Sequence, residues 1–219
     1  ALLLARELGR LLDQVQTEGL SLDRLDGLVP ELYADHWGVT LDFLNIIRSA
    51  WPAHLAESGL MDPAERRNRL LLSQAELWRA SPPTHPVIAA GSTGSIPATA
   101  HLIATVATLP QGMVVLPGLD RVLAEEDWGA VIEDATHPQH GMALLLQKLE
   151  ATRADVMDWP DGGAGPDRTA RVRLIAEALR PAVTTERWRG LAESGGLDKS
   201  AFAGVQWLAA PSQSAEAEM

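Results

Sequence analysis

The sequence of 219 residues contains no cysteine. Disulfide bonds, thiolate ligands for iron–sulfur clusters and catalytic thiols are therefore excluded for this stretch of chain. No apolar run approaches the roughly 20 residues that a membrane-spanning helix needs. The first residues also lack the basic and then apolar pattern of a secretory signal. We therefore expect a cytoplasmic protein without membrane contact.

Positive charge is also scarce. Asp and Glu total 29 against 18 Lys and Arg, which gives a formal net charge of -11. This charge repels nucleic acids at long range, so a freestanding DNA-binding module is not expected and any DNA contact has to be local. The basic residues are nearly all arginine, since Lys148 and Lys199 are the only lysines.

Hydrophobic residues are plentiful, at 46% of the sequence, and they can supply a core for one large domain or two small ones. Up to about residue 81 they recur at helical spacing. We predict one helix from the N-terminus to a stop at Gly19 and a second helix over residues 34–58. Pro52 should kink or split the second helix.

A third helix is predicted from its start signals. Asp62 can act as the N-cap, Pro63 suits the first helical position, and Glu65 can reach back as in a capping box. The face expected to be buried contains Leu70, Leu71, Gln74, Leu77 and Trp78.

After residue 86 the hydrophobic period changes. Residues 87–90 and 113–116 are typical of short buried strands, and a helix is predicted between them. A connection of this length favours parallel strands. We predict two further strands, over residues 154–159 and 204–210. The apolar faces expected on this and two later helices contain Leu102, Ile103, Val106 and Leu109; Met142, Leu145, Leu146 and Leu149; and Leu174, Ile175, Ala178 and Leu179.

These patterns predict an α/β protein that combines a parallel sheet and flanking helices with a helical subdomain. The helical part covers residues 1–81, and residues 82–219 form an α/β segment. Because a helical block can be an insertion in an α/β sheet, the two parts can also form one domain. The chain opens without Met inside a helix and closes on "SQSAEAEM", which resembles a helix start, so we expect the natural protein to continue on both sides.

A turn rich in small residues joins the first strand to its helix. It consists of Gly91, Ser92, Thr93, Gly94 and Ser95. Exposed N–H groups at the start of a helix favour a phosphate, but no lysine completes a Walker motif. The alternative is a plain strand-to-helix turn, with Ser95 or Thr93 as the N-cap and Pro97 in the first turn.

Two other groups of residues have alternative interpretations. His137 and His140, with Asp134 upstream, have a spacing that can bring two imidazoles to one metal ion, although a helix start at Pro138 explains them as well. The acidic run Glu125, Glu126 and Asp127 is typical of a solvated first helical turn rather than of an acid/base pair.

Two arginine clusters can contact phosphates, or can form the polar faces of amphipathic helices. They contain Arg66, Arg67 and Arg69, and Arg168, Arg171 and Arg173.

Four long segments carry a resemblance to a known family. They are "PVIAAGSTGSIPATAHLIATVATLPQGMVVLPGLD" (residues 86–120), "LVPELYADHWGVTLDFLNIIRSAWPAHLAESGLMDPAERRNRLL" (28–71), "HPQHGMALLLQKL" (137–149) and "EALRPAVTTERWR" (177–189). They resemble the AddB family in its alphaproteobacterial form, the helicase/nuclease-like subunit of the bacterial AddAB complex for double-strand break repair. The resemblance covers essentially the whole chain.

The resemblance implies a place within the helicase-like N-terminal half of such a subunit. Residues 1–80 would match the helical insertion of a superfamily 1 motor, and the later part its RecA-like sheet. The nuclease and the iron–sulfur cluster would lie outside this sequence, which itself would hold no cofactor. The implied partners are DNA and an AddA-type helicase–nuclease subunit.

The resemblance also bears on the turn after the first strand. In an active motor that strand ends in an Asp-Glu pair that holds magnesium, whereas here it offers Ala90, Gly91 and Ser92. ATP hydrolysis by this segment is therefore not expected, and the implied role is that of a scaffold or a guide for a DNA strand.

An enzyme remains the alternative. The turn at residues 91–95 can bind a phosphorylated sugar or nucleotide, and His101 is then the nearest candidate for a general base.

Overall fold

The computed structural model divides the chain into two compact units. The residues that it describes are 2–27, 34–159, 166–193, 195–206, 209, 211 and 212. Unit 1 contains residues 1–117 and 144–151, and unit 2 contains residues 118–143 and 152–219.

The predicted boundary at residue 81 does not coincide with this division. Helix α3 (Pro63–Ala80) packs along helix α4 (Pro97–Thr108), and this contact places the predicted helical segment and the first strands in one unit. The predicted α/β segment, residues 82–219, is itself divided between the two units.

Unit 1 opens with helices. They are α1 (Leu2–Thr17), the 3₁₀ helix η1 (Leu22–Gly27) and α2 (Ala34–Glu57). Helix α1 stops at Gly19 as predicted, because Gly19 adopts a φ of 65° that glycine tolerates and other residues disfavour. Helix α2 continues through Pro52 without being split.

The start of α3 confirms part of the prediction. Asp62 is the N-cap and its Oδ1 accepts a hydrogen bond from the Ala64 N–H at 3.3 Å, while Pro63 opens the helix. The capping box is absent, because the Glu65 carboxylate pairs with Arg69 one turn later.

The buried face of α3 matches the prediction only in part, since Leu71, Gln74 and Trp78 are half-buried. Leu70 and Leu77 are each 58% exposed, whereas Ala64 and Ala75 are fully buried. Small side chains on α3 allow the two helix backbones to approach closely, so burial follows the alanines rather than the leucines.

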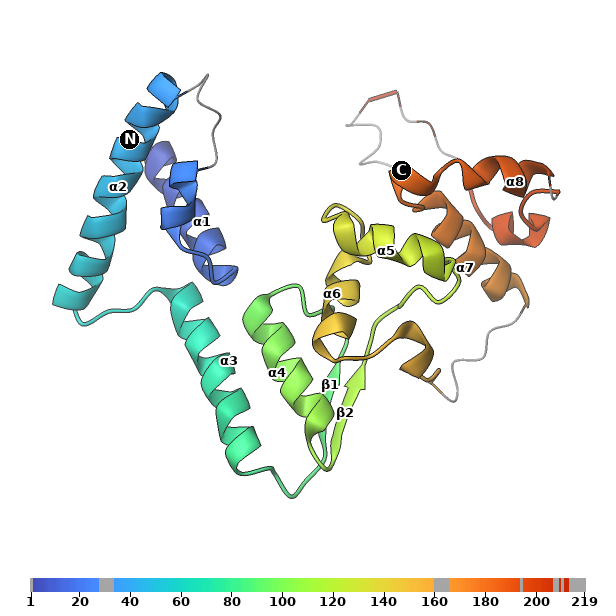
Figure 1. The fold of residues 1–219 in the computed structure, drawn as a ribbon, viewed down its shortest axis with the longest axis horizontal. Coiled ribbons are helices and arrows are strands. Elements are labelled where there is room, and N and C mark those ends of the chain that lie inside the picture. Colours follow the sequence, from blue (N-terminus) through green and yellow to red (C-terminus); the bar gives the residue numbers. More distant parts are fainter. Residues whose placement is uncertain are drawn as a thin grey trace. The chain divides into compact units, whose positions relative to one another are not determined.

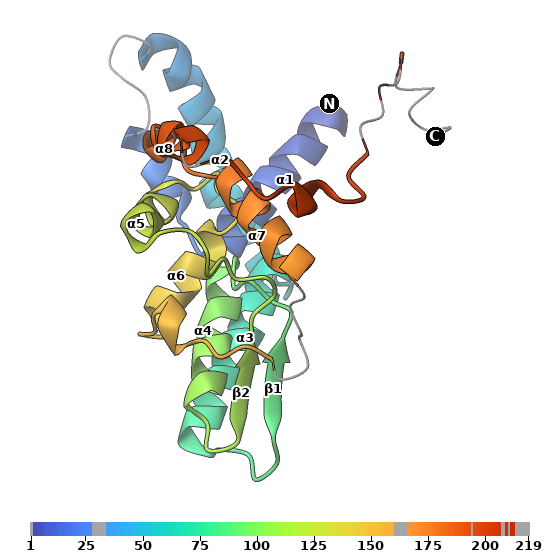
Figure 2. The same cartoon turned by 90° about the vertical axis from the view of Figure 1, so that its right-hand side faces the viewer.

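A strand–helix–strand motif follows, as predicted. Strands β1 (Val87–Ala90) and β2 (Gly112–Val115) pair in parallel, with Val87 opposite Gly112 and Ala90 opposite Val115. Helix α4 connects them and lies along the two strands, with α3 beside it (Figures 1 and 2). The core at this contact consists of Ala100, Ile103 and Leu145, packed against Ala89, Val114, Leu116 and Leu149.

The regular elements of unit 2 are all helices in its described residues. Its elements are α5 (Glu125–Glu133), the first part of α6 (His140–Lys148), η3 (Arg153–Asp155), α7 (Pro166–Ala178), η4 (Ala182–Thr184), α8 (Arg187–Glu193) and η5 (Lys199–Phe202). On α6, Met142 in unit 2 and Leu145 and Leu146 in unit 1 are buried as predicted. On α7 the prediction is wrong, since Ile175 is 51% exposed and Ala176 is buried instead.

The two later strands are not found where the structure describes the chain. Residues 154–159 form the end of η3 and an irregular segment, because the Asp155 carboxylate accepts hydrogen bonds from the Thr152 N–H and hydroxyl and closes a 3₁₀ turn. Residues 204–206 are not a strand, and most of residues 207–210 lie outside the described part. The protein is thus mostly helical, with a two-stranded parallel sheet. None of its described helices has the length and apolar character to cross a membrane.

Candidate functional site

The turn at residues 91–95 uses part of its hydrogen-bonding capacity internally. The Gly91 N–H donates to the Val115 carbonyl at 3.1 Å and so extends the sheet by one bond. The Gly94 N–H donates to Ser92 Oγ at 3.2 Å. Gly91 and Gly94 have φ angles of 76° and 66°, which explains the glycines at these positions.

The expected cap of α4 is wrong in one respect. The N-cap is Ile96, which makes no side-chain hydrogen bond, rather than Ser95 or Thr93. Pro97 occupies the first helical position as predicted. At the carboxyl end of β1 the chain offers Ala90, Gly91 and Ser92, none of which carries a carboxylate.

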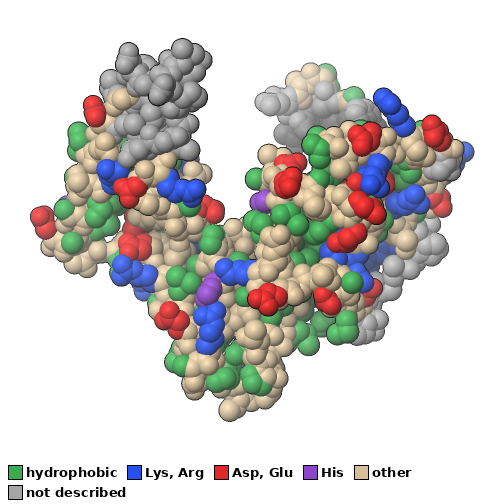
Figure 3. All heavy atoms as spheres, viewed as in Figure 1, with side chains coloured by type: hydrophobic (Ala, Val, Ile, Leu, Met, Phe, Trp, Pro, Cys, Tyr) green, Lys and Arg blue, Asp and Glu red, His purple; other side chains and the backbone are tan. Residues whose placement is uncertain are grey.

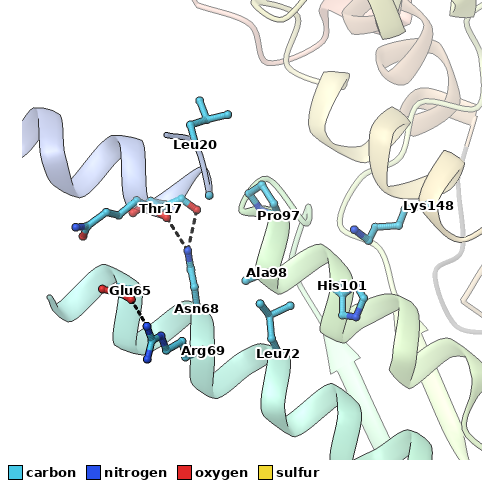
Figure 4. A pocket seen from close by; sticks show the side chains of 12 residues that line it. Thr17, Leu20, Glu65, Asn68, Arg69, Leu72, Pro97, Ala98, His101 and Lys148 are labelled. Carbon is cyan, nitrogen blue, oxygen red and sulfur yellow. Dashed lines mark hydrogen bonds and ion pairs between the residues drawn. The ribbon is translucent and has the colours of Figure 1, made fainter. Parts of the chain in front are cut away.

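A pocket of about 480 Å³ lies beside this turn, wholly within unit 1 (Figure 4). The end of α1, α3, the first half of α4 and the end of α6 form it, and none of the residues 91–95 lines it. Its apolar wall includes Leu20, Leu72, Pro97 and Ala98, and its polar groups include Asn68, Arg69, His101 and Lys148.

Polar contacts between α1 and α3 close one end of the pocket. The Asn68 amide nitrogen donates to the carbonyls of Gln16 and Thr17, at 2.7 and 3.3 Å. Arg67 donates to the Thr17 hydroxyl at 2.7 Å. Sequence analysis assigned Arg67 to a phosphate contact or a solvated face, and here it joins two helices instead.

His101 lies at the other end of the pocket and contacts the guanidinium of Arg79. Its Nε2 lies 2.7 Å from Nη2 of Arg79. Burial lowers the pKa of His101, and the charges of Arg79 and Lys148 lower it further, against an opposing effect of Glu76. Basic side chains and a histidine gather over α3 and α4 in the space-filling view (Figure 3). The surroundings of His101 thus favour its neutral form, which a general base requires.

The arginine cluster on α7 is only partly available to a ligand. The Arg171 guanidinium donates to the Ala203 carbonyl and ties α7 to the segment after η5. Arg168 and Arg173 are exposed. In the other cluster, Arg69 pairs with Glu65.

The two histidines predicted as possible metal ligands contact different segments. His137 Nε2 donates to the Leu179 carbonyl at 2.7 Å, since its Nδ1 accepts from the Gln139 N–H. His140 Nδ1 lies 3.2 Å from the Val131 carbonyl. Helix α6 begins at His140, so Pro138 precedes the helix instead of opening it. Within the described ranges, no three His, Asp or Glu side chains converge as metal ligands would.

The acidic first turn of α5 contains a buried ion pair that the sequence did not indicate. Asp127 is 1% exposed, and its carboxylate pairs with Arg180 and with Arg187, the latter at 3.1 Å. The prediction of a solvated helix start is therefore wrong for Asp127, although Glu125 and Glu126 have exposed side chains. Arg180 lies 53 residues away in the sequence, and no local pattern links the two.

Comparisons with protein-family models, with curated proteins and with solved structures give no match to this chain.

Proposed function

We propose that this chain is part of the helicase-like region of an AddB-type subunit, where it serves as a scaffold or guides a DNA strand without hydrolysing ATP itself. The observation that carries the proposal is the end of β1, a strand in a parallel pair whose connection is a helix. In the proposed correspondence this strand is the one that ends in magnesium-binding carboxylates in a working motor, and here it runs into Ala90, Gly91 and Ser92.

The four segments quoted above support the assignment by their resemblance, and the parallel strand–helix–strand motif is compatible with a piece of a RecA-like sheet. The proposed partners are DNA and an AddA-type helicase–nuclease subunit. The proposed DNA contact is local, because the chain as a whole carries a net charge of -11.

Fluorescence anisotropy of labelled single- and double-stranded DNA, at low and moderate salt, tests the DNA role. The test variant combines Arg168→Glu with Arg173→Glu and keeps Arg171, whose contact with Ala203 is structural. The control combines Arg6→Glu with Arg189→Glu, which changes the net charge equally on other helices. We expect salt-sensitive binding that only the α7 variant loses.

Two results would overturn the proposal. The guide role is overturned if the chain binds no DNA, either alone or together with an AddA-type subunit. The scaffold role is overturned as well if the chain does not bind that subunit. ATP hydrolysis by the purified chain would contradict the proposal that this region has lost the chemistry of a motor.

An enzyme acting at residues 91–95 has weaker support, because none of these residues lines the pocket that contains His101. A thermal-shift screen with sugar phosphates and nucleotides tests it. A ligand at 100 times its dissociation constant adds about 2.7 kcal/mol of stability.

A further inference from the structure

Two cationic side chains and a histidine of unit 1 form a cluster. They are Arg79 on α3, His101 on α4 and Lys148 at the end of α6. A guanidinium only donates hydrogen bonds, so the 2.7 Å contact makes His101 Nε2 an acceptor. The proton of the neutral ring is therefore on Nδ1, and no described residue accepts a hydrogen bond from it.

The cluster also lacks a paired acid. Neither Arg79 nor Lys148 forms an ion pair with any carboxylate in the described part of the chain, in contrast to Arg69, which pairs with Glu65. Glu76 on α3 is the acid that acts on His101 through its charge. Arg79 and Lys148 thus have no ion-pair partner among the described residues, and the one carboxylate that lines the pocket, Glu65, is paired with Arg69.

The pocket offers a space in which a ligand can contact Lys148 and His101. The Lys148 side chain extends from α6 toward Pro97 and His101 (Figure 4). Leu20, Leu72 and Pro97 supply an apolar wall facing the same space. A volume of about 480 Å³ suits a small organic group together with one anion.

We propose that this pocket binds a phosphate group through Lys148 Nζ and the His101 Nδ1–H, with the attached organic group against the apolar wall. Arg79 is the positioning residue that fixes the tautomer of His101. The phosphate can belong to a DNA strand or to a free phosphorylated molecule. The inference goes beyond the proposed function and does not depend on it, because it rests only on this cluster and its pocket.

Binding should be linked to pH. In the free protein, burial, then Arg79 and then Lys148 lower the pKa of His101, and Glu76 opposes them. A bound phosphate adds negative charge and raises the pKa of His101 again. His101 then takes up a proton at Nε2 on binding, and the protonated ring gives up its contact with Arg79, because neither ring nitrogen can then accept a hydrogen bond. A phosphodiester should therefore bind at least about threefold more tightly at pH 6 than at pH 8. A phosphodiester keeps one negative charge over this range, so its own titration does not contribute.

The two lysines of the chain allow a direct test. Reductive methylation with ¹³C-formaldehyde labels Lys148, Lys199 and the terminal amine and keeps their charge, and Lys148→Ala identifies the Lys148 signal. The probes are the dinucleotide TpT, which has one phosphodiester, inorganic phosphate, a dodecamer of thymidylate, and uncharged thymidine. We expect saturable shifts of the Lys148 signal with phosphate-containing probes, and no comparable shift of Lys199.

Two variants sharpen the test. Lys148→Ala should weaken TpT binding about fivefold or more, while Lys199→Ala should leave it unchanged. His101→Gln should abolish the pH dependence and keep part of the affinity. A response to TpT and the dodecamer alone identifies a strand as the source, and a response to inorganic phosphate identifies free phosphate.

The proposal is overturned if no phosphate-containing probe shifts the Lys148 signal, or if Lys148 and Lys199 shift alike. Its failure is distinct from failure of the DNA role, because loss of TpT binding in Lys148→Ala says nothing of the contact that depends on Arg168 and Arg173.

Discussion

Unit 1 and unit 2 bury different kinds of side chain. Around its sheet, unit 1 buries apolar residues, with Ala100, Ile103 and Leu145 at the centre. Unit 2 buries Asp127 and Arg153, whose charges meet partners inside the same unit. Unit 1 also buries one carboxylate, Asp62, as the N-cap of α3. The core around its sheet depends on shape, whereas the stability of unit 2 also depends on the completeness of its ion pairs.

The two units also differ in how some of their basic side chains are paired with acids. In unit 2, Arg180 is held between Asp127 and Glu177, and Arg153 stacks on Trp128 with its Cζ 4.5 Å from the ring centroid. In unit 1, Arg79 and Lys148 have no such described acid. Arg79 and Lys148 therefore differ from Arg153 and Arg180, whose charges are already taken up by acids of unit 2, although the arginine clusters are equally visible in both parts of the sequence.

The largest effect is expected from Gly112→Ala in unit 1. A Cβ atom at this position would lie 1.8 Å from the Val106 carbonyl oxygen, and backbone cannot move aside as a side chain can. We expect a loss of about 4 kcal/mol or more in the free energy of unfolding. Urea titration measures the loss, and hydrogen exchange resolved by peptide should locate it in unit 1.

Gly129→Ala is the matched control in unit 2. Gly129 lies inside α5, and a Cβ atom there would meet nothing within 4 Å. Alanine should stabilise the helix by about 0.5–1 kcal/mol. Equal effects of the two substitutions would contradict the close approach of α4 and β2.

Asp127→Ala tests the dependence of unit 2 on its ion pairs. The substitution leaves the Arg180 side chain, which is 6% exposed, with Glu177 as its remaining described partner. We expect a loss of about 3 kcal/mol in unfolding free energy, confined to unit 2 by hydrogen exchange. Glu126→Gln, at an exposed carboxylate 3.7 Å from Arg187, should cost under about 0.5 kcal/mol.

A double replacement separates the charge from the packing. Asp127→Leu with Arg180→Met removes both partners, so it should cost less than Asp127→Ala. A larger cost for the double variant would mean that the charges themselves stabilise unit 2.

Local patterns predicted the elements whose signal lies within one segment. The periodicity predicted helix α6 with most of its buried residues, and helix α4 with Ile103 and Val106 but without its buried Ala98, Ala100 and Thr105. The short apolar runs at β1 and β2 predicted the parallel pair. Residues 154–159 misled the prediction because the hydrogen bonds between Thr152 and Asp155 favour a turn over a strand.

Contacts between residues far apart in the sequence could not be predicted from local patterns. The turn at residues 91–95 was visible in the sequence. The pocket beside it was not, because Lys148 and His101, which both line it, lie on different helices. The partner of Asp127 is likewise set by the packing of unit 2 and by no spacing. On α3, the burial of alanine in place of leucine follows from how closely α4 approaches.

Gly94→Ala and Gly91→Ala compare packing and backbone strain within one turn. Both glycines have positive φ, which costs alanine about 1 kcal/mol. At Gly94 a Cβ atom would also lie 3.1 Å from the Leu145 methyl groups in the core. We expect a loss of about 2 kcal/mol for Gly94→Ala and about 1 kcal/mol for Gly91→Ala in urea titrations. A larger loss at Gly91 would contradict the packing of this turn on α6.

The smallest effect concerns an exposed carboxylate of unit 2. Hydrogen bonds from the Thr136 hydroxyl and N–H, at 2.6 and 2.9 Å, lower the pKa of Asp134. A lowered pKa means that the stabilisation is present above the unfolded pKa and is lost as the pH falls through the folded pKa. Thr136→Val removes the hydroxyl donor and should raise the pKa of Asp134 toward its ordinary value, as followed by the carboxyl ¹³C shift in an acid titration.

Thr185→Val is its control, because the Thr185 hydroxyl donates to the Ala182 carbonyl and should leave Asp134 unaffected. Near neutral pH, Thr136→Val should be far less destabilising than Asp127→Ala, since the exposed Asp134 can exchange a lost hydrogen bond for water and the buried Asp127 cannot exchange its lost partners in this way. A comparable loss of unfolding free energy in the two variants would show that burial does not decide how much the contacts of an acidic group stabilise unit 2.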